Sequence, residues 1–96
     1  MIVIIPLLPV SSQVLTVTLG GQSCRIEIFA RAFGLFANVF VADVAVALGV
    51  QLRDRVPVIR AEYGMFRGDI TVVDTQGFDD PTAATLGGRH VLAYRA

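Results

Sequence analysis

The sequence contains no lysine and few charges of either sign. All eight basic residues are arginine, eight residues are acidic, and the formal net charge of the 96 residues is zero. Charged residues make up 17% of the chain, whereas about a quarter is usual in a soluble domain. Nucleic-acid binding needs a basic face, so this balance gives it no electrostatic support. Arginine without lysine is typical of protein–protein contacts, and a genome rich in G and C would produce the same bias.

Cysteine and histidine occur only once each, which excludes several kinds of site. Cys24 alone cannot form an intrachain disulfide or a cysteine-based metal cluster. His90 alone cannot form a two-histidine zinc site, and no GxSxG motif supplies a nucleophile. We therefore predict no catalytic residue, no metal and no cofactor. Cys24 is predicted to be a buried apolar residue, and His90 to lie in a strand at an edge or interface.

Apolar residues are abundant instead, at 54% of the chain. A chain of this length forms one domain with a thin core, and such a core cannot bury so many apolar side chains. The surplus must contact a partner, a membrane or another copy of the chain.

The opening segment, MIVIIPLLPVSSQ, has no charged residue. It lacks the positive start of a secretory signal, and its apolar run is shorter than the about 20 residues of a membrane helix. Its β-formers and prolines favour an extended path with few ladder donors. We expect residues 1–13 to form an extended arm or edge strand for assembly, followed by one β domain over residues 14–96. The predicted partner-binding residues of this arm are Ile2, Ile4, Ile5, Pro6, Leu7, Leu8 and Pro9.

A β-hairpin is predicted next, in VLTVTLGGQSCRIEIF. Gly20 and Gly21 suit a two-residue turn with positive φ angles, and the flanking runs alternate between apolar and polar residues. We expect this hairpin domain to fold even without residues 2–9. The predicted cross-strand pairs are Leu19–Gln22, Val17–Cys24 and Leu15–Ile26 on the apolar face, and Thr18–Ser23, Thr16–Arg25 and Val14–Glu27 on the polar face.

The rest of the chain is predicted to be mostly strand. The segment RAFGLFANVF is apolar on both faces, which indicates a strand covered twice or a short buried helix, and VAVALGVQL follows as a second strand after a tight bend. A short helix is predicted over Ile59–Tyr63, and further strands over Ile70–Val73 and HVLAYR. The predicted fold is all-β, a small sandwich or partly open barrel of six or seven short strands with one short helix.

Arginines surround the predicted helix, and acidic residues are interspersed with them. Such mixed charge favours solvent-facing pairs or subunit contacts over binding to phosphates. Asp79 and Asp80, which precede Pro81, are interpreted as turn residues and not as a metal or acid–base pair. The arginines predicted to contact a partner are Arg53, Arg60 and Arg67.

Two long stretches resemble a known family. The segments IIPLLPVSSQVLTVTLGGQSCRIEI and VALGVQLRDRVPVIRAEYGMFRGDITVVDTQGFDDPTAATLGGRHVLAYR are similar to the two halves of the phage baseplate plug family. The chain departs from the family in RAFGLFANVF, where tryptophan is usual, and in VIRAEY, where the family has LLAQY. The residues that carry the resemblance are Pro6, Pro9, Gln13, Gly21, Gln22, Asp74, Asp79, Asp80, Pro81, Thr82, Leu86, Gly87, His90 and Tyr94.

The resemblance implies a non-enzymatic structural subunit of a contractile-tail baseplate, located in the virion and assembled in the host cytoplasm. It implies contacts with hub, tube and spike-associated proteins near the tail axis. Several copies with three-fold or six-fold symmetry are expected, without membrane or nucleic-acid binding. The alternatives are a small ligand-binding β-barrel module, which needs a pocket with convergent polar groups, and a nucleic-acid-binding β module, which the neutral charge disfavours.

Overall fold

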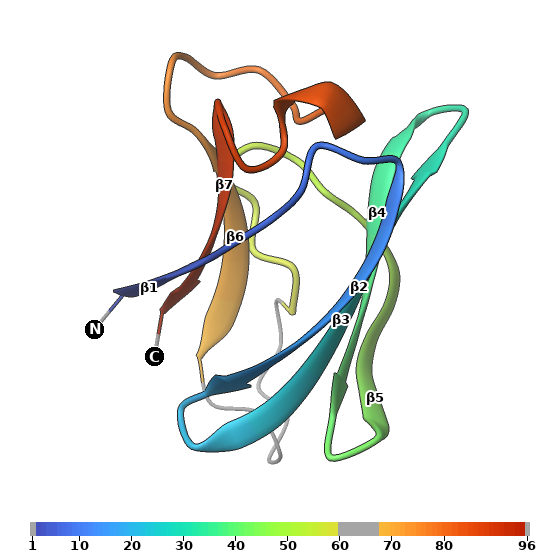
Figure 1. The fold of residues 1–96 in the computed structure, drawn as a ribbon, viewed down its shortest axis with the longest axis vertical. Coiled ribbons are helices and arrows are strands. Elements are labelled where there is room, and N and C mark those ends of the chain that lie inside the picture. The colour runs from blue at the N-terminus through green and yellow to red at the C-terminus, as the bar shows by residue number, and fades with distance from the viewer. Residues whose placement is uncertain (1, 60–67, 96) are drawn as a thin grey trace.

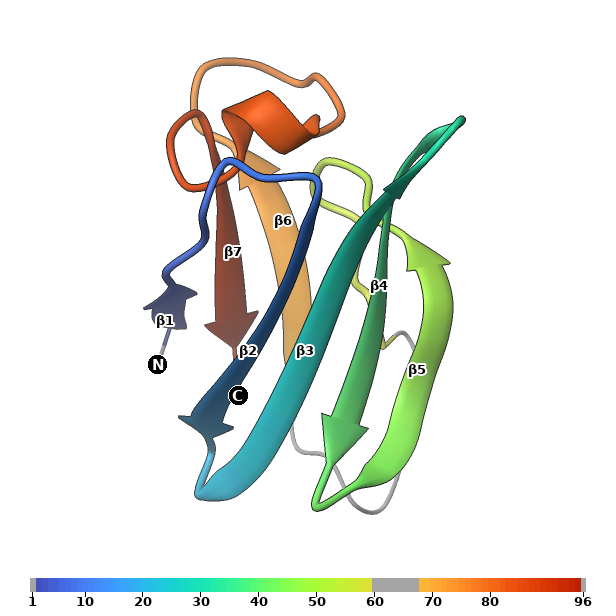
Figure 2. The same cartoon turned by 45° about the vertical axis from the view of Figure 1, so that its right-hand side comes forward.

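Seven strands form two antiparallel sheets packed face to face (Figures 1 and 2). The computed structural model describes residues 2–59 and 68–95. The all-β prediction is confirmed, and of the two predicted architectures the sandwich is the one observed. The three-stranded sheet has the order β1 (Ile2–Ile5), β7 (His90–Arg95), β6 (Asp69–Asp74), and the four-stranded sheet has the order β2 (Ser12–Leu19), β3 (Gln22–Arg31), β4 (Gly34–Val41), β5 (Val44–Gln51).

Helical structure within the described residues is limited to one 3-10 turn, Ala83–Thr85. Of the helix predicted over Ile59–Tyr63, residues 60–63 lie outside the described residues. Before Ile59 the chain is not helical. Asp54 and Pro57 form isolated bridges with Val72 and Thr71, so residues 54–57 run along the outer edge of β6.

The β2–β3 hairpin has the predicted register at all six predicted pairs, from Val14–Glu27 to Leu19–Gln22. Gly20 and Gly21 have φ angles of 58° and 77°, a conformation in which a side chain would be strained. Gly20 also lies against the other sheet, since a Cβ there would be 2.5 Å from the Tyr94 hydroxyl oxygen. Turn chemistry and alternation were local signals, and together they determined the register correctly.

Strand β4 is fully covered on one face only. Leu35, Ala37, Val39 and Val41 are buried between the sheets, while the phenylalanines of the other face are half-buried. The outer face is partly covered by side chains of β3: Phe29 stacks on Phe36 with centroids 6.1 Å apart, and the Arg25 guanidinium lies 4.2 Å from the Phe40 ring. Phe33 belongs to the segment that was predicted to be covered on both faces, but it lies in the β3–β4 turn and is 86% exposed.

The hydrophobic core lies between the two sheets and draws on every strand. Cys24 is fully buried in it, as predicted. Tyr94 of β7 is also fully buried. The largest apolar side chains of this core are Tyr94, Ile5, Leu19, Ile26, Ile28, Leu35, Ile70, Leu86, Leu92, Val39 and Val72.

The opening segment enters the sandwich as the edge strand β1, which pairs with β7 from Ile2–Arg95 to Ile5–Leu92. Residues 6–11 then cross to the other sheet and lead into β2 (Figure 1). Because β1 supplies Ile5 to the core and completes the three-stranded sheet, the expectation that the domain folds without residues 2–9 does not fit the structure.

Candidate protein-binding surface

One end of the sandwich carries the long connections, and we refer to it as the loop end. It consists of residues 6–11, 32–33, 53–55 and 75–89, at the top of Figures 1 and 2. The opposite end, the turn end, carries the hairpin turns Gly20–Gly21 and Ala42–Asp43. The loop end is the only part of the described chain where a buried charged side chain joins several segments, and that side chain belongs to Asp74.

Asp74 is the centre of the loop end. Its carboxylate is fully buried at the end of β6 and accepts from Arg89 in a bidentate pair, at 2.8 Å from Nε and 2.7 Å from Nη2. The backbone N–H groups of Gln76 and Asp79 also donate to it, at 2.8 and 2.9 Å. The Arg89 hydrogen bonds, with these N–H groups, hold the pKa of Asp74 well below its usual range, against the opposing effect of desolvation. Asp74 therefore fixes both ends of the 75–89 loop.

Asp79 and His90 close this loop over the core. Arg89 Nη2 donates to Asp79 Oδ2 at 2.8 Å, and this pairing, after the larger contribution from Asp74, raises the pKa of the arginine. His90 Nε2 donates to the Asp79 carbonyl oxygen at 2.8 Å, while Nδ1 has no hydrogen-bond partner within the described residues. The prediction of an edge or interface histidine is wrong: His90 is 1% exposed and belongs to the central strand of its sheet. The strand pattern could not show that this strand is central.

Residues 53–55, which lie between β5 and β6, are hydrogen-bonded to the end of β6 and to the 75–89 loop. Asp54 Oδ1 accepts from the Asp74 N–H at 2.6 Å, and the Asp54 N–H donates to Asp80 Oδ1 at 3.0 Å. Arg55 donates to the Gly77 carbonyl at 2.9 Å, and its guanidinium lies 4.6 Å from the centre of the Phe78 ring. The paired acidic residues thus act as loop-forming groups, in agreement with their interpretation as turn residues.

The crossing of residues 6–11 lies directly on this network. Leu7 is buried beneath the loop, and a Cβ at Gly87, where φ is 78°, would be 2.2 Å from the Leu7 carbonyl oxygen. The Gln13 side chain makes two hydrogen bonds with the Leu8 backbone, as a paired strand residue would. Its Nε2 donates to the Leu8 carbonyl at 2.8 Å, and its Oε1 accepts from the Leu8 N–H at 3.1 Å. The Leu8 side chain is consequently held pointing outward.

Several large apolar side chains of the loop end are exposed to solvent. Leu8 is 63% exposed, Phe33 86% and Phe78 83%, and Val10 is exposed to a smaller degree. They come from the crossing, the β3–β4 turn and the 75–89 loop. The crossing packs on the 75–89 loop at Gly87, and the β3–β4 turn is held separately by Gln51 Nε2, which donates to the Phe33 carbonyl oxygen at 2.9 Å. Phe33 and Phe78 were missed in the sequence, although each is a phenylalanine next to a turn glycine, a position where burial is not expected. This set, Leu8, Val10, Phe33 and Phe78, is the candidate binding surface.

The predicted partner-binding residues divide into three groups. Ile5 is buried because alternate side chains of an edge strand point inward, and Leu7 of the crossing is buried beneath the 75–89 loop, so neither is available to a partner. Arg60 and Arg67 lie outside the described residues. The exposed members are Ile2 and Ile4 on β1, Pro6, Leu8 and Pro9 in the crossing, and Arg53, whose Nη1 is 3.8 Å from Asp80 Oδ2.

The described part of the chain contains neither a metal-binding cluster nor a membrane-spanning helix. Residues 2–59 and 68–95 contain no group of three or more histidine, cysteine, aspartate or glutamate side chains able to hold a metal ion. No helix in these ranges is long and apolar enough to cross a membrane.

The model of one protein family, described as cyanophage baseplate Pam3 plug gp18, matches residues 2–96. The match covers nearly the whole chain, so the chain belongs to this family, as its resemblance predicted. No curated protein matches the chain. Family membership identifies a plug protein of the phage tail baseplate, located in the virion in association with other baseplate proteins. Within the described structure, the residues that carried the resemblance include Asp74, Asp79 and Gly87, which build the loop end, and Gln13, which fixes the crossing.

Proposed function

We propose that this member of the baseplate plug family is a non-enzymatic structural subunit that packs through its loop end against hub and tube proteins near the tail axis. Spike-associated proteins are further neighbours in this proposal. Assembly takes place in the host cytoplasm, and several copies with three-fold or six-fold symmetry enter each tail. The observation that carries the proposal is the exposure of Phe33 and Phe78 at the loop end, where the Asp74 network holds the loop that carries Phe78.

The composition of the loop end supports a protein partner. Aromatic residues and arginine are enriched at the centres of protein interfaces, and Phe78 here lies under the Arg55 guanidinium. Phe33 and Phe78 belong to two different connections of the loop end, so a partner that covers both would contact both segments.

The rigidity of the loop end also supports docking. A surface that is already ordered loses less conformational entropy on binding than a flexible loop does. Here the Asp74–Arg89 pair and the Leu7–Gly87 contact hold the 75–89 loop and the crossing before any partner arrives. Arg53 and Asp80 lie at the rim with roughly half of each side chain exposed, where an ion pair contributes specificity more than affinity.

Phe33→Ser is the cleanest test, because the side chain is almost fully exposed and its loss leaves the domain's own contacts in place. We expect incorporation into purified tails, measured by quantitative mass spectrometry after complementation, to fall at least about ten-fold. Phe78→Ser should act in the same direction. Unchanged incorporation of both variants would refute the role of the loop end.

Val14→Ser is the matched control. Val14 is 63% exposed but projects from β2 on the outer face of the four-stranded sheet and is not part of the candidate binding surface. We expect it to enter tails at the wild-type level. Thermal unfolding of all three variants should occur within a few degrees of wild type, since exposed positions change stability by less than about 0.5 kcal/mol.

A further inference from the structure

Within residues 2–59 and 68–95, one outer sheet edge is covered by another segment and others are bare. Residues 54–57 run along β6 and bridge to it at Val72 and Thr71. In contrast, β1 pairs only with β7, and β5 pairs only with β4, among the strands of the described residues. These two bare edges lie on opposite sides of the sandwich in both views (Figures 1 and 2).

Neither bare edge carries a charge that would prevent pairing. No charged residue precedes Arg25, and none occurs from Val44 to Leu52. Natural proteins protect free edges with lysine, other charges or proline, because an unprotected edge pairs with another chain. The absence of such protection indicates that both edges are covered in the assembled protein.

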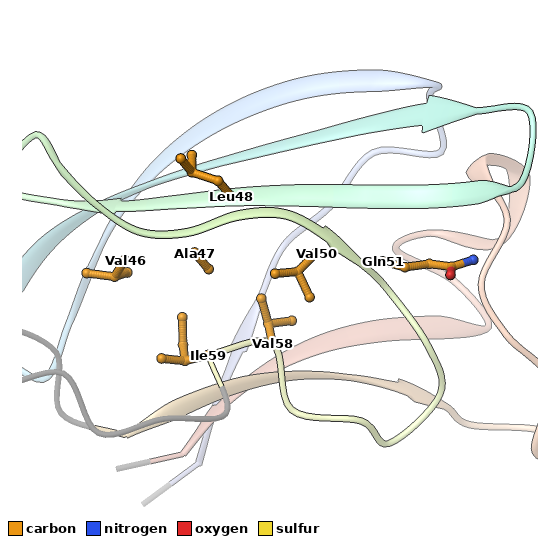
Figure 3. Close-up of a pocket in the computed structure, with 7 residues that line it drawn as sticks. All are labelled: Val46, Ala47, Leu48, Val50, Gln51, Val58 and Ile59. Atoms are coloured by element: carbon orange, nitrogen blue, oxygen red, sulfur yellow. The ribbon is translucent and has the colours of Figure 1, made fainter.

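The two edges differ in shape. Ile2 and Ile4 project from β1 and are 63% and 56% exposed. Beside β5 there is a groove of about 370 Å³, and Leu48 at its rim is 63% exposed. Figure 3 shows Val58 and Ile59 on one side of this groove, facing Val46, Ala47 and Val50 of β5 on the other. The projecting apolar side chains of the β1 edge are thus complementary in shape to the groove beside β5, which apolar side chains line.

Charges at the ends of these edges are also complementary. Arg95 ends β7, pairs in register with Ile2 of β1 and is exposed. Asp43 immediately precedes β5; its side chain is 91% exposed and also pairs with Arg25 of its own copy at 3.2 Å. The end of β7 and the start of β5 both point toward the turn end (Figure 2), so copies placed side by side in the same orientation bring Arg95 of one toward Asp43 of the next.

We propose that the β1 edge of one copy docks on the β5 groove of the next copy, with Ile2 and Ile4 over the groove. Because the two surfaces are different, the contact is head-to-tail, and its repetition about a three-fold or six-fold axis closes a ring. The inference deepens the proposed function by specifying how its copies contact each other, and it rests on that function only in assuming that several copies meet in the baseplate. It uses the sides of the sandwich and leaves the loop end free for the hub and tube proteins.

Cysteine cross-linking in assembled baseplates tests this contact. In a Cys24→Ala background, copies with Ile4→Cys and copies with Leu48→Cys carry different tags and assemble together before mild oxidation. We expect a mixed disulfide dimer at a yield at least about ten-fold above either variant alone, because a disulfide needs Cβ atoms about 4 Å apart. Thr16→Cys, exposed on the outer face of β2, replaces Ile4→Cys in the control and should give no mixed dimer.

Two results would overturn the inference. Strong cross-linking of Ile4→Cys alone would show a two-fold contact between β1 strands. No cross-link in intact baseplates would show that another protein covers these edges. Phe33→Ser separates this inference from the proposed function: it should abolish incorporation if the loop end binds the hub and tube, whatever the outcome for the edges.

Discussion

At the turn end of the sandwich, two residues suffice to reverse the chain, whereas the loop end depends on side chains from three segments: residues 53–55, the end of β6 and the 75–89 loop. Gly20 and Gly21 connect β2 to β3 through their own positive φ angles. The 75–89 loop instead depends on the Asp74–Arg89 pair, with Asp54 and Asp79 attached to it. Order at one end is thus local in the sequence, and order at the other requires the whole fold to be in place.

This difference shows where the molecule is vulnerable. A turn held by backbone geometry responds to the φ preferences of its residues, and each change costs or gains about 1 kcal/mol. Loss of one member of a buried ion pair lowers stability strongly, because the other member is left charged and desolvated. Substitutions at the loop end should therefore have the larger effects.

Arg89→Leu should give the largest effect. It removes the bidentate partner of a fully buried carboxylate, and we expect the melting temperature to fall by about 10 °C or more. The counterpart at the turn end is Asp43→Asn, which removes an exposed pair with Arg25 at 3.2 Å and should shift the melting temperature by no more than a few degrees. Similar shifts for both variants, measured by circular dichroism, would contradict the comparison.

Acid should weaken the loop end through the same carboxylate. The pKa of Asp74 is lowered in the folded protein, mainly by Arg89, so the unfolded chain binds its proton more readily. The stabilisation is therefore present above the ordinary aspartate pKa of about 4 and is lost as the pH falls below it toward the lowered value. Urea unfolding from pH 7 to pH 3 should show this loss in wild type and a smaller loss in Asp74→Asn. Asp80→Asn, a change at an exposed carboxylate, should retain the wild-type slope.

Gly87→Ala and Gly21→Ala form a matched pair across the two ends. Their φ angles are 78° and 77°, so the backbone strain of an alanine is the same, about 1–2 kcal/mol. Only at Gly87 would the added Cβ meet backbone, the Leu7 carbonyl oxygen, whereas nothing lies within 4 Å at Gly21. We expect Gly87→Ala to lower the free energy of unfolding by about 1–3 kcal/mol more. Equal losses in chemical denaturation would show that the crossing moves away from the loop without cost.

Ala42→Gly should give the smallest effect, and in the opposite direction. Ala42 has a φ angle of 49° in the β4–β5 turn, which strains an alanine but not a glycine. After the greater unfolded-state entropy of glycine is subtracted, we expect a gain of about 0.5 kcal/mol in unfolding free energy. Ala32→Gly, in a turn where φ is not positive, should instead lose stability. A loss at both positions would contradict strain at Ala42.

The sequence allowed prediction where the signals are local. The alternation around Gly20–Gly21 predicted the register of β2 and β3, and the alternation of β7 correctly separated Leu92 and Tyr94 from Val91 and Ala93. The loop-end network could not be predicted, because Asp54, Asp74 and Arg89 are far apart in the sequence and only the sheet topology brings them together.

The opening arm shows a different limit. Partner contact was assigned to six consecutive residues, 4–9, although a strand presents only alternate side chains to one face. The structure buries Ile5 and Leu7 and exposes Ile4 and Leu8. Composition indicated that apolar surface would remain exposed, and only the fold could show which side chains carry it.

The pairing of β1 with β7 has a consequence for synthesis. Residues 2–5 must wait for residues 92–95 to leave the ribosome before they find their strand partner. Until then an uncharged, isoleucine-rich stretch remains open to misassociation with other nascent chains. Synthesis of residues 92–95 is thus the step that first shields residues 2–5, and any stall before that step leaves the chain prone to aggregate.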